Sequence, residues 1–226
     1  MINAQKADPE MPESPRLLRD EVYLRLREEI IGCRVAPGED LREQDLAARF
    51  EVSKQPVREA LLRLERERLV TVHPRQGYRV NPVSLADARD IFRFREVLES
   101  ACVADAAQYA RDEDLKALDR YRTFDADASE FIKYNCAFHV AVAMCSPNRR
   151  MREEAAALVS QADRLVRVSI DSGRGRDTTR LVAEHVEIID ALQAREGRRA
   201  ATLLRAHVIN AQKRVVANLS RHSVIS

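Results

Sequence analysis

Apolar residues recur at helical spacing along most of the chain. In the first such run, Leu18, Val22, Leu26 and Ile30 are each four residues apart, which predicts an amphipathic helix from about residue 17 to residue 32. Beyond residue 84 the same periodicity covers nearly every segment and is interrupted by short stretches rich in Gly, Pro, Ser and Asn. The helices expected there span residues 84–109, 112–123, 127–145, 149–169, 178–194 and 198–220. The chain is therefore predicted to be mainly α-helical.

The segment before residue 82 combines helices with a small β element. The expected order after the first helix is a turn at 36–38, helices over 43–50 and 54–67, and a two-stranded hairpin over 69–72 and 78–80. Ser53 is a natural N-cap for the third helix, and Pro56 fits its first turn because proline lacks the N–H that would remain unbonded there. The buried stripe of that helix is predicted to be Val57, Ala60, Leu61 and Leu64.

Composition and patterning divide the chain into three parts. Residues 1–15 contain three prolines and no apolar period, which predicts a flexible arm. Residues 16–81 form the domain with the hairpin, and residues 84–222 form an all-helical antiparallel bundle. With 226 residues, 45% hydrophobic content and no Trp, the chain can build cores of mainly helical type. Because it lacks an apolar signal core and any stretch of about 20 apolar residues, we expect a cytoplasmic protein without membrane contact.

Four cysteines are scattered among apolar helical neighbours. They lack CxxC or other metal-binding spacing, and buried reduced thiols are the expected state in a cytoplasmic protein. These residues are Cys33, Cys102, Cys136 and Cys145.

Charge is concentrated in one region although the formal net charge is only +2. From Ser53 to Arg79 there are seven basic and three acidic residues, a local excess of 7 − 3 = +4. A short helix, a tight turn and a second helix with a polar start are typical of a helix-turn-helix, whose second helix enters the major groove of DNA. The outward residues at that start, Ser53, Lys54, Gln55 and Arg58, carry donors suited to phosphates and base edges.

The sequence APGEDLREQDLAARFEVSKQPVREALLRLERERLVTVHPRQGYRV resembles the winged helix-turn-helix of the GntR family of bacterial transcription regulators. The resemblance implies a homodimer that binds double-stranded DNA at a short inverted repeat, with the wing tip at Gly77 near the minor groove. The base and phosphate contacts that it implies are Lys54, Gln55, Arg58, Arg75 and Gly77, with Arg42 and Gln44 contacting the backbone. This chain departs from the family where Arg42 replaces a small capping residue and Lys54 replaces a common Arg, which removes a bidentate fork.

Three histidines fall on the apolar stripes of three different helices of the predicted bundle. His139, His185 and His207 are expected to converge, and neutral imidazoles in a core form a set of ligands for a divalent transition metal. A single such histidine would more often be a satisfied core residue. Asn135 lies one turn before His139, so its amide oxygen can reach the same point.

The helical part resembles the FCD ligand-binding domain of the FadR-type branch of GntR regulators, through FRFREVLESACVAD, NCAFHVAVAMCSPN, EHVEIIDAL and LLRAHV. The resemblance implies a metal such as zinc or nickel, bound by one Asp and three His. In this chain Asn135 stands at the Asp position, which removes a negative charge and is expected to weaken metal binding.

Arg95 is predicted to face inward, where an unpaired guanidinium would be costly. It can pair with Glu99 one turn later, or it can clamp an anionic effector, as the resemblance implies for FCD domains that bind organic acids. Both can hold, with Glu99 orienting Arg95. Arg164 and Arg167 are weaker candidates that could equally face solvent.

These observations favour a transcription regulator that responds to a ligand. We expect it to repress transcription and to bind a small organic acid as its effector. One alternative is a regulator that senses the metal ion directly. Another is a metal-dependent hydrolase, but no carboxylate stands at a recognisable spacing to act as its base, so the protein is not expected to be an enzyme.

Overall fold

The computed structural model describes residues 15–125, 130–170 and 178–220, which form two compact units. The chain passes from one unit to the other between residues 81 and 82, and residues 31–33 belong to the second. Most of the arm predicted at residues 1–15 lies outside the described residues, as do the predicted break at 171–175 and the start of the helix predicted from residue 127.

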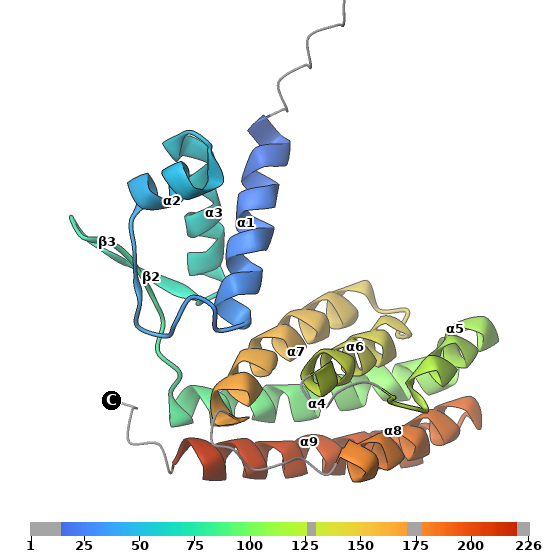
Figure 1. Ribbon diagram of the computed structural model, residues 1–226. Coiled ribbons are helices and arrows are strands. Elements are labelled where there is room, and N and C mark those ends of the chain that lie inside the picture. Colours follow the sequence, from blue (N-terminus) through green and yellow to red (C-terminus); the bar gives the residue numbers. More distant parts are fainter. Residues whose placement is uncertain (1–14, 126–129, 171–177, 221–226) are drawn as a thin grey trace, which may run out of the picture. The chain divides into compact units, whose positions relative to one another are not determined.

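The first unit contains three helices and a small sheet (Figure 1). Its elements are α1 (Pro15–Ile31), β1 (Asp40–Leu41), α2 (Glu43–Phe50), α3 (Lys54–Arg66), β2 (Val70–His73) and β3 (Gly77–Val80). Apolar residues from α1 and α3 make its core: Leu26, Ile30, Val57, Leu61 and Leu64 are completely or almost completely buried. The stripe predicted for the third helix is confirmed, because all four of its residues are buried.

The hairpin prediction is incomplete, because the sheet has three strands in the order β1-β3-β2. Strand β1 pairs antiparallel with β3, with Leu41 opposite Tyr78, and β2 pairs with β3 on its other side. The two residues of β1 are too few to show an alternating pattern in the sequence. They are recruited by the turn at 36–38, where Gly38 has φ +84° and donates its N–H to the carbonyl of Val80 at 2.8 Å.

The second unit is entirely helical in its described residues. It consists of α4 (Leu85–Tyr109), α5 (Asp112–Lys116), η1 (Ala117–Tyr121), α6 (Phe131–Met144), α7 (Arg149–Ile170), α8 (Thr178–Gln193) and α9 (Gly197–Leu219). The single helix predicted over 112–123 is wrong in detail, because it tightens after Lys116 into a 3₁₀ turn. At the start of α4, the Ser84 hydroxyl accepts the backbone N–H of Asp87 at 3.0 Å and so caps the helix.

Helix α4 is central to this unit and contacts α6, α7, α8 and α9 (Figure 1). Its inner face contributes Phe92, Val103 and Ala106 to a core that also contains Phe138 and Ile188. No helix in the described residues is long and apolar enough to span a membrane.

The cysteine prediction is only partly right. All four thiols are free, but Cys102 alone is buried, whereas Cys33, Cys136 and Cys145 are half-buried. Burial raises the pKa of Cys102 to about 12 and that of Cys145 to about 11, so neither is a thiolate near neutral pH.

Candidate functional site

Helices α2 and α3 are joined by a turn of three residues, as in a helix-turn-helix. Glu51 ends α2 in the left-handed conformation with φ +56°, and Ser53 stands at the N-cap of α3 with extended backbone. The Ser53 side chain makes no capping hydrogen bond, so its hydroxyl remains exposed at the start of the helix. Arg42 occupies the equivalent place before α2 and does not cap it either, as predicted from its chemistry.

Lys54, Gln55 and Arg58 all lie exposed on the outer face of α3. Arg58 is held by Glu43 from the first turn of α2: its Nε donates to Oε1 at 3.0 Å and its Nη2 donates to Oε2 at 2.9 Å. This side-on fork uses one edge of the guanidinium and leaves the Nη1/Nη2 edge, with one N–H from each nitrogen, for a base or phosphate. The hydrogen bond from Arg58 also keeps the pKa of Glu43 below its usual value.

The segment from Ser53 to Arg79 carries the excess of basic residues, and carboxylates from outside it pair with several of these cations. Arg58 pairs with Glu43, Arg63 with Asp20 and Arg79 with Asp40. The local excess of +4 counted along the sequence is therefore partly neutralised in space. Lys54, Arg75 and Arg42 are exposed and form no ion pair with the described residues, so they remain the open cations near the helix start and the wing.

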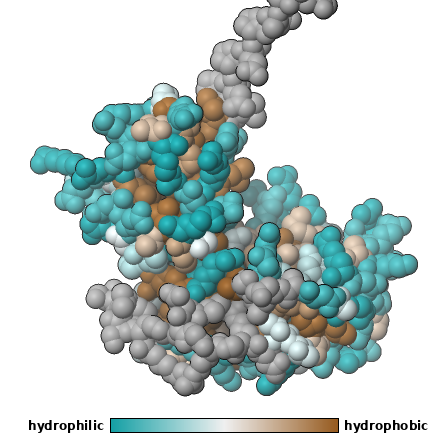
Figure 2. Space-filling model, in the orientation of Figure 1, coloured by the Kyte–Doolittle hydropathy of each residue, from teal (hydrophilic) through white to brown (hydrophobic). Residues whose placement is uncertain are grey.

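The wing extends from the first unit as a hydrophilic projection (Figures 1 and 2). Arg75 is exposed in the turn between β2 and β3, with φ +66°. Gly77 is the first residue of β3 rather than part of that turn. It has φ +109°, and a Cβ there would lie 2.6 Å from the carbonyl oxygen of Leu41, so the close pairing of β1 with β3 requires a glycine.

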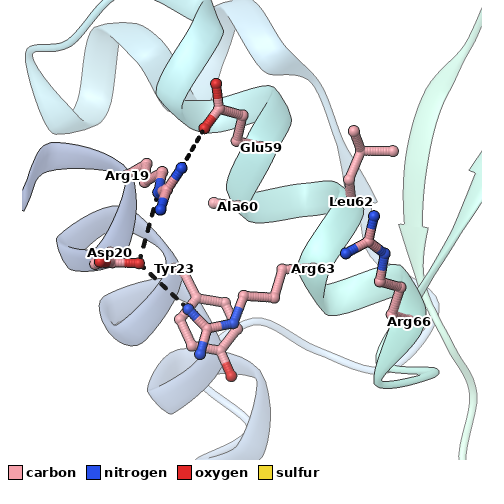
Figure 3. Close-up of a pocket in the computed structure, with 8 residues that line it drawn as sticks. All are labelled: Arg19, Asp20, Tyr23, Glu59, Ala60, Leu62, Arg63 and Arg66. Carbon is pink, nitrogen blue, oxygen red and sulfur yellow. Dashed lines mark hydrogen bonds and ion pairs between the residues drawn. The ribbon is translucent and has the colours of Figure 1, made fainter. Parts of the chain in front are cut away.

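Polar contacts join α3 to α1 (Figure 3). Arg19 donates to Glu59 at 3.3 Å, Asp20 pairs with Arg63, and the Arg63 guanidinium lies over the ring of Tyr23, 3.6 Å from its centroid. These residues line a pocket of about 310 Å³. The charged side chains that line this pocket are largely paired with one another. Their contacts hold α3 against α1.

In the helical unit, His139 of α6, His185 of α8 and His207 of α9 meet in the core. Each of them can offer one nitrogen such that the three lie within 4.8 Å of one another, and all three side chains are buried. The predicted convergence is therefore confirmed. The ring of Phe138 stacks on His185 with centroids 3.8 Å apart and restrains that imidazole.

Two carboxylates orient two of these imidazoles. Glu99 Oε2 lies 2.6 Å from His139 Nδ1, and Glu184 Oε2 lies 2.6 Å from His207 Nδ1. Because an ionised carboxylate can only accept, Nδ1 carries a proton in both rings, and Nε2 is the nitrogen left to bind a metal. Carboxylate–histidine pairs of this kind hold metal-ligating imidazoles in position.

Arg95 completes the group behind His139. Its Nε donates to Glu99 Oε1 at 2.6 Å, and both side chains are almost fully buried. The predicted pairing of Arg95 with Glu99 is confirmed. Burial raises the pKa of Glu99, but Arg95 and His139 outweigh that effect and lower it to about 2, so the carboxylate stays ionised.

Burial also keeps the imidazoles of His139 and His185 neutral. It lowers the pKa of His139 to about 4 in spite of Glu99, and it lowers that of His185 well below the ordinary value. The Nδ1 of His185 lies 3.4 Å from the Tyr134 hydroxyl, and its Nε2 is buried with no hydrogen-bond partner in the described part of the chain. A buried nitrogen without a partner is costly, and a metal ion would satisfy it. Three buried imidazoles, two of them oriented by carboxylates, thus fit a divalent transition metal.

Both units of the chain match a known protein family. Residues 18–80 match "Bacterial regulatory proteins, gntR family", and residues 90–210 match the "FCD domain". The chain belongs to the GntR family. As a GntR protein with an FCD domain it is a transcriptional regulator and not an enzyme.

Individual relatives extend along most of this GntR chain. It is 28% identical over 80% of its length to 81% of the "HTH-type transcriptional repressor RspR" of Escherichia coli K12. It is 33% identical over 85% of its length to 83% of an uncharacterised HTH-type regulator in an unstable DNA locus of Streptomyces ambofaciens. The solved structure of E. coli McbR/YncC covers 90% of this chain and 98% of its own, with a TM-score of 0.74 and 21% identity, and shows the same fold.

The other predicted site residues of this GntR regulator lie outside the contacts described above. Asn135 is half-buried on α6, one turn before His139. Gln44 is exposed on α2. Arg164, which could equally have faced solvent, is buried, and this burial lowers the pKa of its guanidinium. Arg167 is half-buried and pairs with Asp163 at 3.0 Å on its own helix.

Sequence reasoning missed three residues that orient functional groups: Glu43, Glu184 and Tyr134. Glu43 reaches Arg58 only because α2 crosses α3, and Glu184 reaches His207 only because α8 packs on α9. Helical spacing shows which side chains share a face of one helix. It does not show which residues of another helix they contact. The one available signal was the position of Glu184 immediately before His185.

Proposed function

We propose that this GntR regulator is a repressor that binds a short inverted-repeat operator as a homodimer and is controlled by a small organic acid. The observation that carries the proposal is the presence of both an exposed, cationic recognition helix and a buried cluster of three histidines in the FCD domain. The first supplies contacts to DNA and the second supplies an anchor for an effector.

DNA contacts are assigned to the open donors of the first unit. Lys54, Gln55 and Arg58 would face base edges and nearby phosphates, with Ser53 and the first amides of α3 on a phosphate. Arg75 and Gly77 would approach the backbone and minor groove through the wing. Arg42 and Gln44 complete the set at α2.

The effector site is assigned to the histidine cluster. His139, His185 and His207 would hold a divalent transition metal, zinc or nickel, with the Asn135 oxygen as a fourth ligand. When bound, that metal supplies open coordination positions for a carboxylate. Arg95, oriented by Glu99, is the proposed contact for the effector's negative charge.

Control of DNA binding requires the effector to distinguish two states of the dimer. It must bind the DNA-free state more tightly than the DNA-bound state, and DNA then weakens effector binding by the same factor. The organic acid would therefore release the operator, as expected for derepression.

The test begins with selection of duplexes from a randomised library by the full-length protein. We expect an inverted repeat, and we expect binding to the selected duplex to weaken when metal-loaded protein is given the correct carboxylate. Arg58→Ala should lower affinity and reduce the salt slope. If no selected sequence is preferred over random DNA, the DNA-binding part is wrong. Release by zinc or nickel alone, without organic acid, would instead favour the direct metal sensor.

A further inference from the structure

Gln55, in the first turn of α3, is held from one side by a carboxylate of its own helix. Its Nε2 donates to Glu59 Oε1 at 2.9 Å, one helical turn later. Hydrogen bonds from Gln55 and Arg19 lower the pKa of Glu59, so this carboxyl group is ionised near neutral pH. An ionised carboxylate can only accept hydrogen bonds. The nitrogen of the Gln55 amide, and not its oxygen, therefore faces Glu59.

Glu59 is itself held from another helix (Figure 3). Arg19 of α1 donates through Nη1 to Glu59 Oε2 at 3.3 Å, so each oxygen of this carboxylate has a partner. The Nε of Arg19 also lies 3.8 Å from Asp20, which pairs with Arg63 of α3. These ion pairs connect Gln55 to the contacts between α1 and α3. They restrain an exposed side chain that otherwise has several rotamers to choose from.

The amide of Gln55 keeps one donor and one acceptor for a ligand. A glutamine carries two N–H groups and one carbonyl oxygen. Glu59 uses one N–H, and within the part of the chain that the structure describes the Gln55 oxygen accepts no hydrogen bond. The side chain is exposed at the N-terminal end of α3, where residues of a helix-turn-helix contact base edges.

We infer that Gln55 recognises an adenine in each half of the operator, with Glu59 as its positioning residue. In the major groove adenine presents an acceptor, N7, beside a donor, the N6 amino group, and these match the free N–H and the oxygen of Gln55. Guanine presents two acceptors, and cytosine and thymine each offer a single hydrogen-bonding group. The inference rests on the proposed function, whose operator it provides with a defined base pair.

The surroundings of Gln55 favour a base over a phosphate. Phosphate oxygens only accept, so a phosphate would use the N–H and leave the Gln55 oxygen beside a negative charge. The nearby Glu59 carboxylate would also be repelled by a phosphate. Lys54 and Ser53, which are exposed at the same helix start, supply the donors that a phosphate needs.

The experiment measures binding of the full-length protein by fluorescence anisotropy. The probes are the duplex selected from the randomised library and duplexes in which one base pair is replaced symmetrically in both halves. Wild type should show an A·T position at which replacement weakens binding by roughly 10-fold or more. An adenine whose N7 is replaced by carbon still pairs with thymine, and at that position it should weaken wild-type binding several-fold. Gln55→Ala should bind the selected duplex and both replacements at that position within about twofold of one another.

A second variant tests the positioning role of Glu59. Glu59→Ala frees the Gln55 amide and also removes a negative charge, so discrimination at the adenine position should fall while binding to random-sequence DNA stays the same or tightens. A merely structural defect would weaken both. The matched control is Glu21→Ala on α1, which removes an exposed carboxylate paired with Arg25 at 3.4 Å and should leave discrimination unchanged. Circular dichroism checks that each variant is folded.

The outcomes separate this assignment from the proposed function. If Gln55→Ala weakens binding to every duplex by the same factor, or if wild type tolerates the loss of N7, Gln55 does not recognise that adenine and the proposed repressor stands. Full discrimination in Glu59→Ala would overturn the positioning role. A selection that yields no preferred sequence would overturn the DNA-binding part of the proposed function together with this inference.

Discussion

Replacing Gly77 by alanine should loosen the wing, and Gly38→Ala provides a matched control in the same sheet region. Both glycines have positive φ, +109° and +84°, so each substitution introduces backbone strain of about 1–3 kcal/mol. A Cβ on Gly38 meets nothing within 4 Å, whereas one on Gly77 lies 2.6 Å from the carbonyl oxygen of Leu41. Only Gly77→Ala must therefore push β1 away from β3.

The cost of that separation is the pairing of Leu41 with Tyr78 and its neighbours. At about 1 kcal/mol for each backbone hydrogen bond, Gly77→Ala should cost roughly 1–2 kcal/mol more than Gly38→Ala. Hydrogen exchange followed by mass spectrometry reports the local opening free energy of β1 and β3 in the full-length protein. Faster exchange in β3 is expected for Gly77→Ala. If both variants exchange equally, the close approach of the wing strands does not constrain this position.

Three further substitutions test other parts of the structure. Glu184→Gln should weaken zinc binding by about 10–100-fold because it loses the charged partner of His207, measured by competition with a chromogenic chelator; unchanged affinity would rule out that role. Glu43→Gln should reduce discrimination between the selected operator and single-base variants by releasing Arg58, and an unaltered specificity ratio would contradict the fork as an orienting device. Phe138→Ala should destabilise the protein by about 3–5 kcal/mol in urea unfolding, because a fully buried ring stacked on His185 is lost; a cost below 1 kcal/mol would contradict this packing.

The helical periodicity of this sequence predicted most of the fold, because the apolar positions of each helix indicate which of its sides is buried. In the stripe of α1, Val22, Leu26 and Ile30 are buried as the spacing predicts, and the helix ends at Ile31, close to the expected position. Strand β1 was missed because two residues carry no period, and its position depends on how the turn at 36–38 brings the chain back to β3.

The histidine cluster was predictable for a related reason: a polar residue on an apolar stripe must point into the core. What the stripe could not predict is the partner on another helix, as with Glu184 and His207 or Glu43 and Arg58. Such pairs depend on the crossing of two helices and on side-chain length. These contacts also orient the His207 imidazole and the Arg58 guanidinium.

We propose that the three histidines of the FCD domain bind the metal that anchors the effector. Its most direct test is elemental analysis of untagged protein after exposure to zinc and nickel and removal of free ions, with His185→Ala and Asn135→Asp beside wild type. We expect about one transition metal ion per chain in wild type, its loss in His185→Ala, and tighter retention in Asn135→Asp. Wild-type protein that retains no metal, or a His185→Ala variant that retains as much as wild type, would contradict it.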